Sequence, residues 1–467
     1  MLSRRLTPLI VASGLFMENL DGTVLSTALP AIAADLHRDP ITLKLALTAY
    51  LVSLAVFIPA SGWVADRFGA RNVFCAAIGV FTLASIACGF SADLPTLVLG
   101  RLVQGMGGAM MVPVGRLIVF RSTPKSELVG AFAMLTMPAL FGPLLGPPLG
   151  GFITTYFHWR WIFWINVPIG ILGAALAWRF LPNDREETPP PFDAKGFALS
   201  GVGLVGAMFG FTALGRGFLP LPAALGLLAV GALALAAYVR HARVVRDPIL
   251  DLGLFRIQTF RASVLGGWLF RLGIGAIPFL LPLMFQLGFG MTAFQSGLLT
   301  LAAAAGALLM KSGVTRVLRV TGFRSLLIWN GVLCAAFLAA NALFTAQTPR
   351  LAISAVLLVG GLFRSLQFTS LNALGFADVP TASMSRATSL SGVAQQLALS
   401  SGVAVGAAAI QLSQFALGDA SLVSRDFVPA FFALGALALL AVPVFAALPD
   451  DVGAELAGGR SVPRPAE

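Results

Sequence analysis

Charged residues are scarce in this chain. Asp, Glu, Lys and Arg make up 11% of its 467 residues, against about 25% in an ordinary soluble protein. Histidine and cysteine number three each, and no two cysteines have the CxxC spacing of a metal or redox site. The chain also lacks a GxxxxGK[ST] loop for ATP phosphates and a nucleophile placed with a base. The sequence therefore predicts no enzyme, no cofactor and no metal site.

Apolar residues take the place of the missing charge. They form 57% of the chain, and the mean hydropathy is +0.88. Apolar stretches of about 20 residues, the length that crosses a hydrocarbon core, recur fourteen times. We therefore expect an all-α polytopic membrane protein with fourteen transmembrane helices in a lipid bilayer. The expected spans are 8–33, 42–63, 72–91, 96–118, 130–156, 161–181, 196–215, 220–239, 260–288, 294–312, 325–346, 350–374, 387–416 and 427–448.

Basic residues set the expected orientation. The net charge of +11 would suggest a nucleic-acid partner for a soluble domain, but here most arginines fall in alternate loops. By the positive-inside rule these loops are cytoplasmic, and an even number of spans leaves both termini there. Arg4 and Arg5 before an apolar run could also mark a cleaved signal peptide, but Glu18 and Asp21 interrupt that run. We expect no nucleic-acid partner.

The spans fall into a pattern of six, two and six. A strongly polar linker begins at Pro182, after the sixth span. A shift of 260 residues lays Gly142 on Gly402 and Gly100 on Gly360, which indicates a duplication and two pseudo-symmetric six-helix bundles. The expected parts are an N-terminal bundle at 1–181, a linker with two additional transmembrane helices at 182–258, a C-terminal bundle at 259–448 and a disordered cytoplasmic tail at 449–467.

The loop between the second and third spans carries the most specific motif. It reads GWVADRFGAR, from Gly62 to Arg71. Its glycines permit a tight turn, and Asp66 can bind another arginine or a helix N-terminus when the cytoplasmic side is closed. A plain positive loop is the alternative. The expected cytoplasmic gate consists of Gly62, Asp66, Arg67, Gly69 and Arg71.

Prolines and glycines crowd the fifth span, which reads GPLLGPPLGG over 142–151. This run would disrupt a lipid-facing helix, because proline removes a backbone hydrogen bond. Glycines at every fourth position instead let a neighbouring helix approach to backbone contact. We therefore expect a seam where protein packs against protein. It comprises Gly142, Pro143, Gly146, Pro147, Gly150 and Gly151.

These motifs resemble those of a known family. The loop over 62–71 resembles the signature loop of the major facilitator superfamily, and the Gly-Pro run resembles the motif of its antiporters. LDGTV in the first span and WRWIF at the start of the sixth are similar to the fourteen-helix drug:proton antiporters of the EmrB and QacA type. Within that type the resemblance is strongest to MdtD-like multidrug transporters, through PASGW at 59–63 and GGAMMVPVGR at 107–116. The second half matches weakly, since its loop has no acid between Lys311 and Arg324.

Two acids in the first span are candidates for proton coupling. Glu18 and Asp21 share a helix face, and two neighbouring acids in a low-dielectric site cannot easily both ionise. The resemblance implies the proton-carrying role for Asp21, whereas Glu18 rests on its position alone. Arg101 in the fourth span is their obvious partner, because an unpaired guanidinium is costly in a membrane. A purely structural role for either acid is the alternative.

Other polar residues of the spans are expected at a substrate cavity. Arg271 and Arg364 could accept an acidic or hydrogen-bonding part of a substrate, or could instead join helices. The second half holds no acid deep within a span, which favours neutral, zwitterionic or anionic amphiphiles over lipophilic cations. The expected cavity set is Asn19, Gln104, Arg271, Arg364, Gln367, Asn372, Gln395 and Gln396.

The resemblance implies proton-coupled efflux of amphiphilic drugs or related small molecules. It further implies transport by alternating access and a location of the protein in the bacterial inner membrane. The expected partners are a small-molecule substrate and protons, and the protein is expected to be a monomer. The alternative is an exporter or facilitator of a specific metabolite, anionic or zwitterionic, with the same fold. A channel would need a continuous polar stripe through several spans, and the sequence has none.

Overall fold

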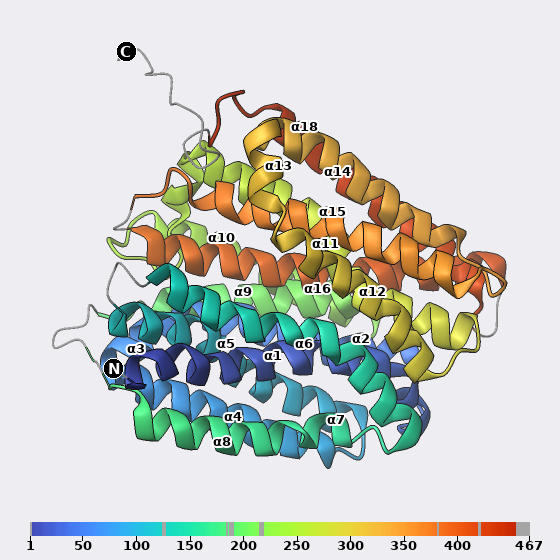
Figure 1. Ribbon diagram of the computed structural model, residues 1–467, viewed down its shortest axis with the longest axis horizontal. Coiled ribbons are helices and arrows are strands. Elements are labelled where there is room, and N and C mark those ends of the chain that lie inside the picture. The colour runs from blue at the N-terminus through green and yellow to red at the C-terminus, as the bar shows by residue number, and fades with distance from the viewer. Residues whose placement is uncertain are drawn as a thin grey trace. The chain divides into compact units, whose positions relative to one another are not determined.

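The computed structural model describes residues 2–123, 128–183, 185, 191–213, 219–380, 383–418 and 422–453. Within these residues every regular element is a helix and no strand occurs, so the all-α class is confirmed (Figure 1). Residues 186–190 of the expected linker and 454–467 of the expected tail lie outside the described part of the chain.

Contacts divide the chain into two compact units. Unit 1 comprises Met1–Leu250 and Pro278–Leu301, and unit 2 comprises Asp251–Ile277 and Ala302–Glu467. Helices α11 and α12 are therefore each shared between the units. The helices before them are α1 (Leu2–Asp35), α2 (Lys44–Phe57), α3 (Ser61–Phe68), α4 (Ala70–Gly89), α5 (Leu94–Ser122), α6 (Leu128–Tyr156), α7 (Trp161–Trp164), α8 (Asn166–Phe180), α9 (Ala194–Ala213) and α10 (Leu221–Ala242). The others are α11 (Gln258–Leu283), α12 (Ala293–Lys311), α13 (Val314–Thr321), α14 (Phe323–Ala340), α15 (Arg350–Phe376), α16 (Met384–Leu417), α17 (Val428–Leu439) and α18 (Ala441–Ala446).

Twelve helical stretches in the described residues are long and apolar enough to cross a membrane. The two expected spans outside this set, 8–33 and 130–156, fall on α1 and α6, helices of 34 and 29 residues. The count of fourteen spans therefore stays a prediction. A multi-pass membrane protein also agrees with the exposed apolar side chains, which include Ile171 and Leu172 on α8 and Leu233 on α10.

The two helices of the expected linker belong to unit 1. There α9 packs against α2 and α10 packs against α9. The ring of Phe197 at the start of α9 lies 5.8 Å from that of Phe57. Asp193 joins the hairpin at its base, because it accepts a hydrogen bond from the backbone N–H of Gly196 and contacts His241 Nε2 at 2.7 Å. Burial would raise the pKa of Asp193, but these hydrogen bonds outweigh burial and lower it.

The expected duplication has structural counterparts inside each unit. In unit 1, α3 is followed directly by Gly69, whose φ is +91°, and in unit 2, α13 is followed directly by Gly322, whose φ is +71°. Only glycine adopts such backbone angles without strain, so both turns require it. Similarly, Gly142 of α6 abuts the backbone of α1, while Gly402 of α16 abuts the backbone of α11.

Candidate functional site: a buried ion pair on the first helix

Asp21 of α1 and Arg101 of α5 form an ion pair inside unit 1. Arg101 Nη1 donates to Asp21 Oδ2 over 2.5 Å, and the side chains are 0% and 2% exposed. The expected pairing of Arg101 with an acid of the first span is therefore present, and the acid is Asp21. A carboxylate and a guanidinium can both be buried in the protein interior only because each compensates for the hydration that the other has lost.

Amides from α5 and from one further helix, α8, complete the surroundings of Asp21. Gln104 Nε2 and Asn166 Nδ2 each donate to Asp21 Oδ1 over 2.9 Å. Both amides also reach Ser85 Oγ on α4, at 2.8 and 3.3 Å. Asp21 thus accepts three hydrogen bonds, one of them from a charged donor. All the donors come from unit 1.

The guanidinium of Arg101 has a second set of neighbours. Its Cζ lies 4.3 Å from the ring centroid of Tyr50, and its Nε donates to the carbonyl of Ala46 over 3.4 Å. Gly105 and Gly108 make this approach possible, because a Cβ at either would press against α2. Arg101 Nη2 has no partner among the described residues. Nη1 also donates to Gln104 Oε1 over 2.5 Å, so Nη2 is the one nitrogen of the guanidinium that has no acceptor in the described structure.

Glu18 lies outside this network. It is half-buried one turn from Asp21, its Oε2 has no hydrogen-bond partner in the described structure, and Arg116 is its principal charged neighbour. The structure thus places Glu18 beside Asp21 without bringing it into contact with Arg101. Asn19 uses its amide within α1, donating to the carbonyl of Leu15 over 2.8 Å.

The loop after the second span forms an ion pair at the end of unit 1. Arg121 Nη2, in the last turn of α5, donates to Asp66 Oδ1 of α3 over 2.7 Å, with both side chains about a quarter exposed. We call this contact the latch. The arginines of the loop itself do not pair with Asp66: Arg67 is exposed, and Arg71 lies over the ring of Trp178, 4.7 Å from its centroid. Gly62 has open space beside it.

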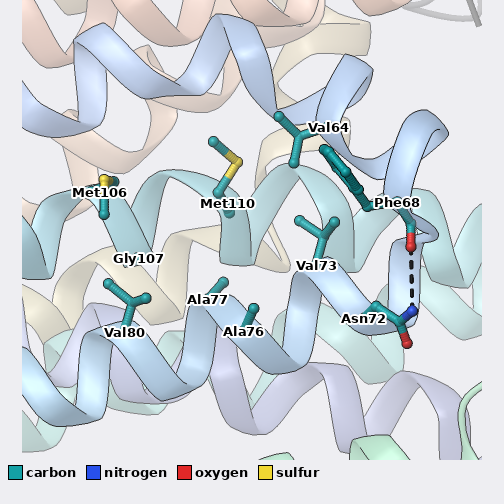
Figure 2. Close-up of a pocket in the computed structure, with 10 residues that line it drawn as sticks. All are labelled: Val64, Phe68, Asn72, Val73, Ala76, Ala77, Val80, Met106, Gly107 and Met110. Carbon is teal, nitrogen blue, oxygen red and sulfur yellow. Dashed lines mark hydrogen bonds between the residues drawn. The ribbon is translucent and has the colours of Figure 1, made fainter.

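Gly69 lets the turn between α3 and α4 approach the segment that follows α8. A Cβ there would overlap the amide of Asn183, whose Oδ1 accepts a hydrogen bond from the backbone N–H of Asn72 over 3.3 Å. Beside the turn, α3, α4 and α5 form an apolar groove of about 450 Å³ (Figure 2). Phe68 and Asn72 lie at the loop end of this groove, joined by a hydrogen bond of 3.3 Å from Asn72 Nδ2 to the carbonyl of Phe68. No titratable residue lines it.

The Gly-Pro run of α6 packs along α1, the helix that carries Asp21. A Cβ at Gly146 would overlap Thr23, and a Cβ at Gly150 would overlap Val24 and Thr27. Thr23 Oγ1 also donates to the carbonyl of Gly142 over 3.2 Å. The helix stays continuous despite four internal prolines. The seam expected from the sequence thus has α1 as its neighbour, and its last glycine, Gly151, abuts Ala293 and Phe294 in the same unit.

Asp35 fastens the far end of α1. Trp159 Nε1 and Arg160 Nη1 donate to its Oδ2 over 3.0 and 2.9 Å. The indole hydrogen bond, followed by that of the guanidinium, lowers the pKa of Asp35. Arg160 Nη2 also donates to the carbonyl of Ser91. The end of α1 is thus fixed to the connections that precede α5 and α7.

The expected cavity residues of unit 2 differ in their surroundings. Gln367 is wholly buried and fully engaged, accepting from Asn330 Nδ2 over 2.8 Å and donating to the carbonyl of Leu327 over 3.1 Å. Arg271 is buried and donates to Asn372 Oδ1 over 2.7 Å. Arg364 is half-buried, and so are Gln395 and Gln396 of α16; the Oε1 of Gln396 has no partner in the described structure.

Comparison with known proteins identifies the family. A model of the Major Facilitator Superfamily matches residues 11–403. The chain belongs to the major facilitator superfamily. It is 40% identical over 365 residues, 78% of each chain, to a protein of Pectobacterium atrosepticum provisionally named multidrug resistance protein MdtD. A protein of the same name from Escherichia coli is 42% identical over 320 residues, 68% of each chain.

Solved structures share the fold of this superfamily member. A D-xylose-proton symporter has a TM-score of 0.69 at 15% identity, and the match covers 96% of this chain and 98% of the symporter chain. A POT family transporter in complex with a thioalcohol-conjugated peptide has a TM-score of 0.70 at 15% identity, with 94% of each chain covered. The resemblance of the motifs to the major facilitator superfamily and to MdtD-like members is confirmed by the family model and the relatives, which indicate a multi-pass transporter rather than an enzyme.

Sequence reasoning missed three residues of the site. Ser85 accepts a hydrogen bond from Gln104, and Asn166 donates one to Asp21. The ring of Tyr50 lies against the guanidinium of Arg101. Asn166 could have been found, because a lone amide inside the apolar stretch of α8 needs a partner within the protein. Ser85 gave no such signal, since a helical serine can satisfy its hydroxyl on its own backbone, as Ser85 also does on Phe81.

Proposed function

We propose that this protein exports amphiphilic small molecules in exchange for protons, across the bacterial inner membrane and by alternating access. The observation that carries the proposal is the buried carboxylate of Asp21, held by Arg101, Gln104 and Asn166 within one unit. A charge at this depth is costly and needs a functional reason. The names of the relatives, multidrug resistance proteins, support drugs or similar amphiphiles as cargo.

The proposed topology is the one expected from the sequence. Fourteen spans, arranged as six, two and six, place both termini in the cytoplasm of a monomer. Helices α1 and α6 supply the two spans beyond the twelve. The proposed parts remain the bundles at 1–181 and 259–448, the linker with two helices at 182–258 and the tail at 449–467.

In the proposed proton step, Asp21 changes between ionised and protonated forms. A proton on Oδ2 removes the anionic acceptor of Arg101 Nη1 and leaves it the neutral Gln104 Oε1 at 2.5 Å, so the guanidinium then lacks a counter-charge. Because Gln104 and Asn166 both bind Oδ1, they can hold the side chain in place while Oδ2 is protonated. Proton binding is thereby linked to release of the Arg101 contact.

The latch and the seam have proposed roles in the conformational cycle. The Asp66–Arg121 pair links the ends of α3 and α5, so it stabilises the arrangement in which these ends are close. The glycines of α6 let it slide or tilt on α1 with few side chains in the way. Because α1 carries Asp21, motion along this seam would reach the proton site directly.

The alternative is an exporter or facilitator of a specific anionic or zwitterionic metabolite. It is favoured by the buried Arg271 in unit 2. A facilitator would move its substrate without moving protons, so flux assays with an imposed pH gradient separate the two functions.

The test uses the purified protein in proteoliposomes with a preset pH gradient and a panel of chemically diverse amphiphiles. We expect some amphiphiles to dissipate the gradient through the wild-type protein, and Asp21→Asn to abolish this exchange. Glu18→Gln is the matched variant, an acid on the same helix outside the network, and should retain exchange. Exchange that survives in Asp21→Asn would refute the role of Asp21, and substrate flux without proton movement would favour the facilitator.

A further inference from the structure

Unit 2 buries a guanidinium without a counter-charge. Arg271 of α11 is 2% exposed, and its Nη2 donates to the neutral amide of Asn372 over 2.7 Å. Its Nε has no hydrogen-bond partner in the described part of the chain. Gly267, one turn earlier, leaves room for the group, because a Cβ there would overlap Arg271 Nη1. The guanidinium therefore has a place in the fold but lacks compensation for its charge.

No acid in the described residues of unit 2 lies within a long α-helix. The acids of these residues lie between α-helices or after the last one, and no carboxylate contributes to the electrostatic surroundings of Arg271. Removing a cation from water without an anion costs several kcal/mol. The acids are Asp251, Asp378, Asp426, Asp450 and Asp451.

A second cation lies on the helix that faces Arg271. Arg364, Phe368 and Asn372 follow each other at intervals of four along α15, so they share one face of that helix. The guanidinium carbon of Arg271 lies 5.3 Å from the ring centroid of Phe368. Arg364 makes no hydrogen bond or ion pair with any described residue. All three residues of this face are half-buried, so none of them is sealed inside the protein.

We propose that Arg271, Arg364 and Asn372 bind the anionic group of the transported amphiphile, a carboxylate, sulfonate or phosphate. The apolar part of the same molecule lies against Phe368. A planar guanidinium suits such groups, because it can donate two parallel hydrogen bonds to two of their oxygens. The bound anion supplies the charge that unit 2 lacks. The proposal rests on the proposed export of amphiphiles and names their chemical class.

The test compares two probes that differ in the anionic group alone. Anilinonaphthalene sulfonate is an amphiphile with a sulfonate, and N-phenylnaphthylamine has the same aromatic frame without it. Binding to the purified protein in phosphatidylcholine nanodiscs is measured by fluorescence, with empty nanodiscs as background. We expect the sulfonate to bind the wild-type protein at least about tenfold more tightly than the neutral probe, as one charge-assisted hydrogen bond provides. Equal affinity of the two probes would overturn the proposal.

Variants then locate the binding site. Arg271→Gln and Arg364→Gln should each weaken sulfonate binding about tenfold and leave the neutral probe within about twofold. Arg350→Gln is the matched control, since it removes an exposed arginine at the start of the same helix. If both probes lose affinity equally, Arg271 only joins helices and the proposal fails.

Asn372→Asp keeps the test decisive if Arg271→Gln does not fold. It places a carboxylate within hydrogen-bond distance of Arg271 Nη2, so the protein itself supplies the anion. We expect normal folding and loss of sulfonate binding, and retained binding would contradict the proposal. Added phosphatidylserine separates the possible sources of the anion: if it competes with the sulfonate at the site, a lipid headgroup occupies it and cargo recognition is refuted.

Asp21→Asn separates this inference from the proposed function. It should keep sulfonate binding while losing proton exchange. Proton exchange of other amphiphiles without preferential sulfonate binding would remove the inference and leave the proposed function standing.

Discussion

Replacing Asp21 by Asn tests the energetics of the buried ion pair. The asparagine Oδ1 can still accept from Gln104 and Asn166, because both donate to Oδ1 of the aspartate. At the Oδ2 position, however, an amide N–H₂ now faces Arg101 Nη1, and two donors meet across 2.5 Å. The variant thus leaves a guanidinium of 0% exposure without its counter-charge. We expect a loss of about 3–5 kcal/mol in the free energy of unfolding.

A second substitution should recover most of this loss. Arg101→Met removes the charge and keeps an unbranched side chain against the ring of Tyr50. Because uncharged replacements of a buried pair are often close to neutral, the double variant should lie within about 2 kcal/mol of the wild-type protein. Neither variant should exchange protons, since both lack the titrating carboxylate.

The assay is denaturation in mixed detergent micelles, followed with a thiol-reactive dye. Cys88 and Cys334 are buried and become reactive only when the protein unfolds. A double variant that is no more stable than Asp21→Asn alone would refute the reasoning, because the instability would then not arise from the uncompensated Arg101. Arg101→Met alone should also be less stable than the double variant.

Three further predictions concern the seam, the latch and the linker. Gly146→Val should lower the free energy of unfolding by about 1–3 kcal/mol, because a valine side chain at this position has no space against α1. Gly79→Ala is the control: position 79 faces open space, so this variant should leave the free energy of unfolding unchanged. Asp66→Asn and Arg121→Gln should each change the export rate. A double-mutant cycle on the free energy of unfolding should give a coupling of about 0.2–1 kcal/mol, since the pair is partly exposed. A coupling of zero would contradict the latch. The pKa of Asp193 is lower in the folded protein than in the unfolded chain, so its contribution to stability is complete above the unfolded-state pKa and is lost as the pH falls through the folded-state pKa. Asp193→Asn should therefore make the free energy of unfolding less dependent on pH below about pH 4. A denaturation profile that is unchanged in this pH range would contradict the prediction.

The expectation of a proton site depended on both the sequence and the fold. The position of Glu18 and Asp21, one turn apart on one span, made both acids candidates, and only the resemblance favoured Asp21. The structure separates them, because Asp21 faces the amides of α5 and α8, whereas Glu18 faces toward Arg116. Similarly, the loop motif indicated an acid ready to bind an arginine, but the partner, Arg121, lies outside the motif.

The sequence by itself determined that the chain is a multi-pass helical membrane protein and which superfamily its motifs resemble. Spacing and composition are enough for these conclusions, because the bilayer requires long apolar helices with internally satisfied backbones. Only the tertiary structure decided which side chains meet Asp21, since its partners lie 80 to 145 residues away along the chain. The physical reason is that helices that are apolar on every side carry no periodic signal of which face turns inward. Packing of glycines against neighbouring backbones sets that rotation, and with it the site.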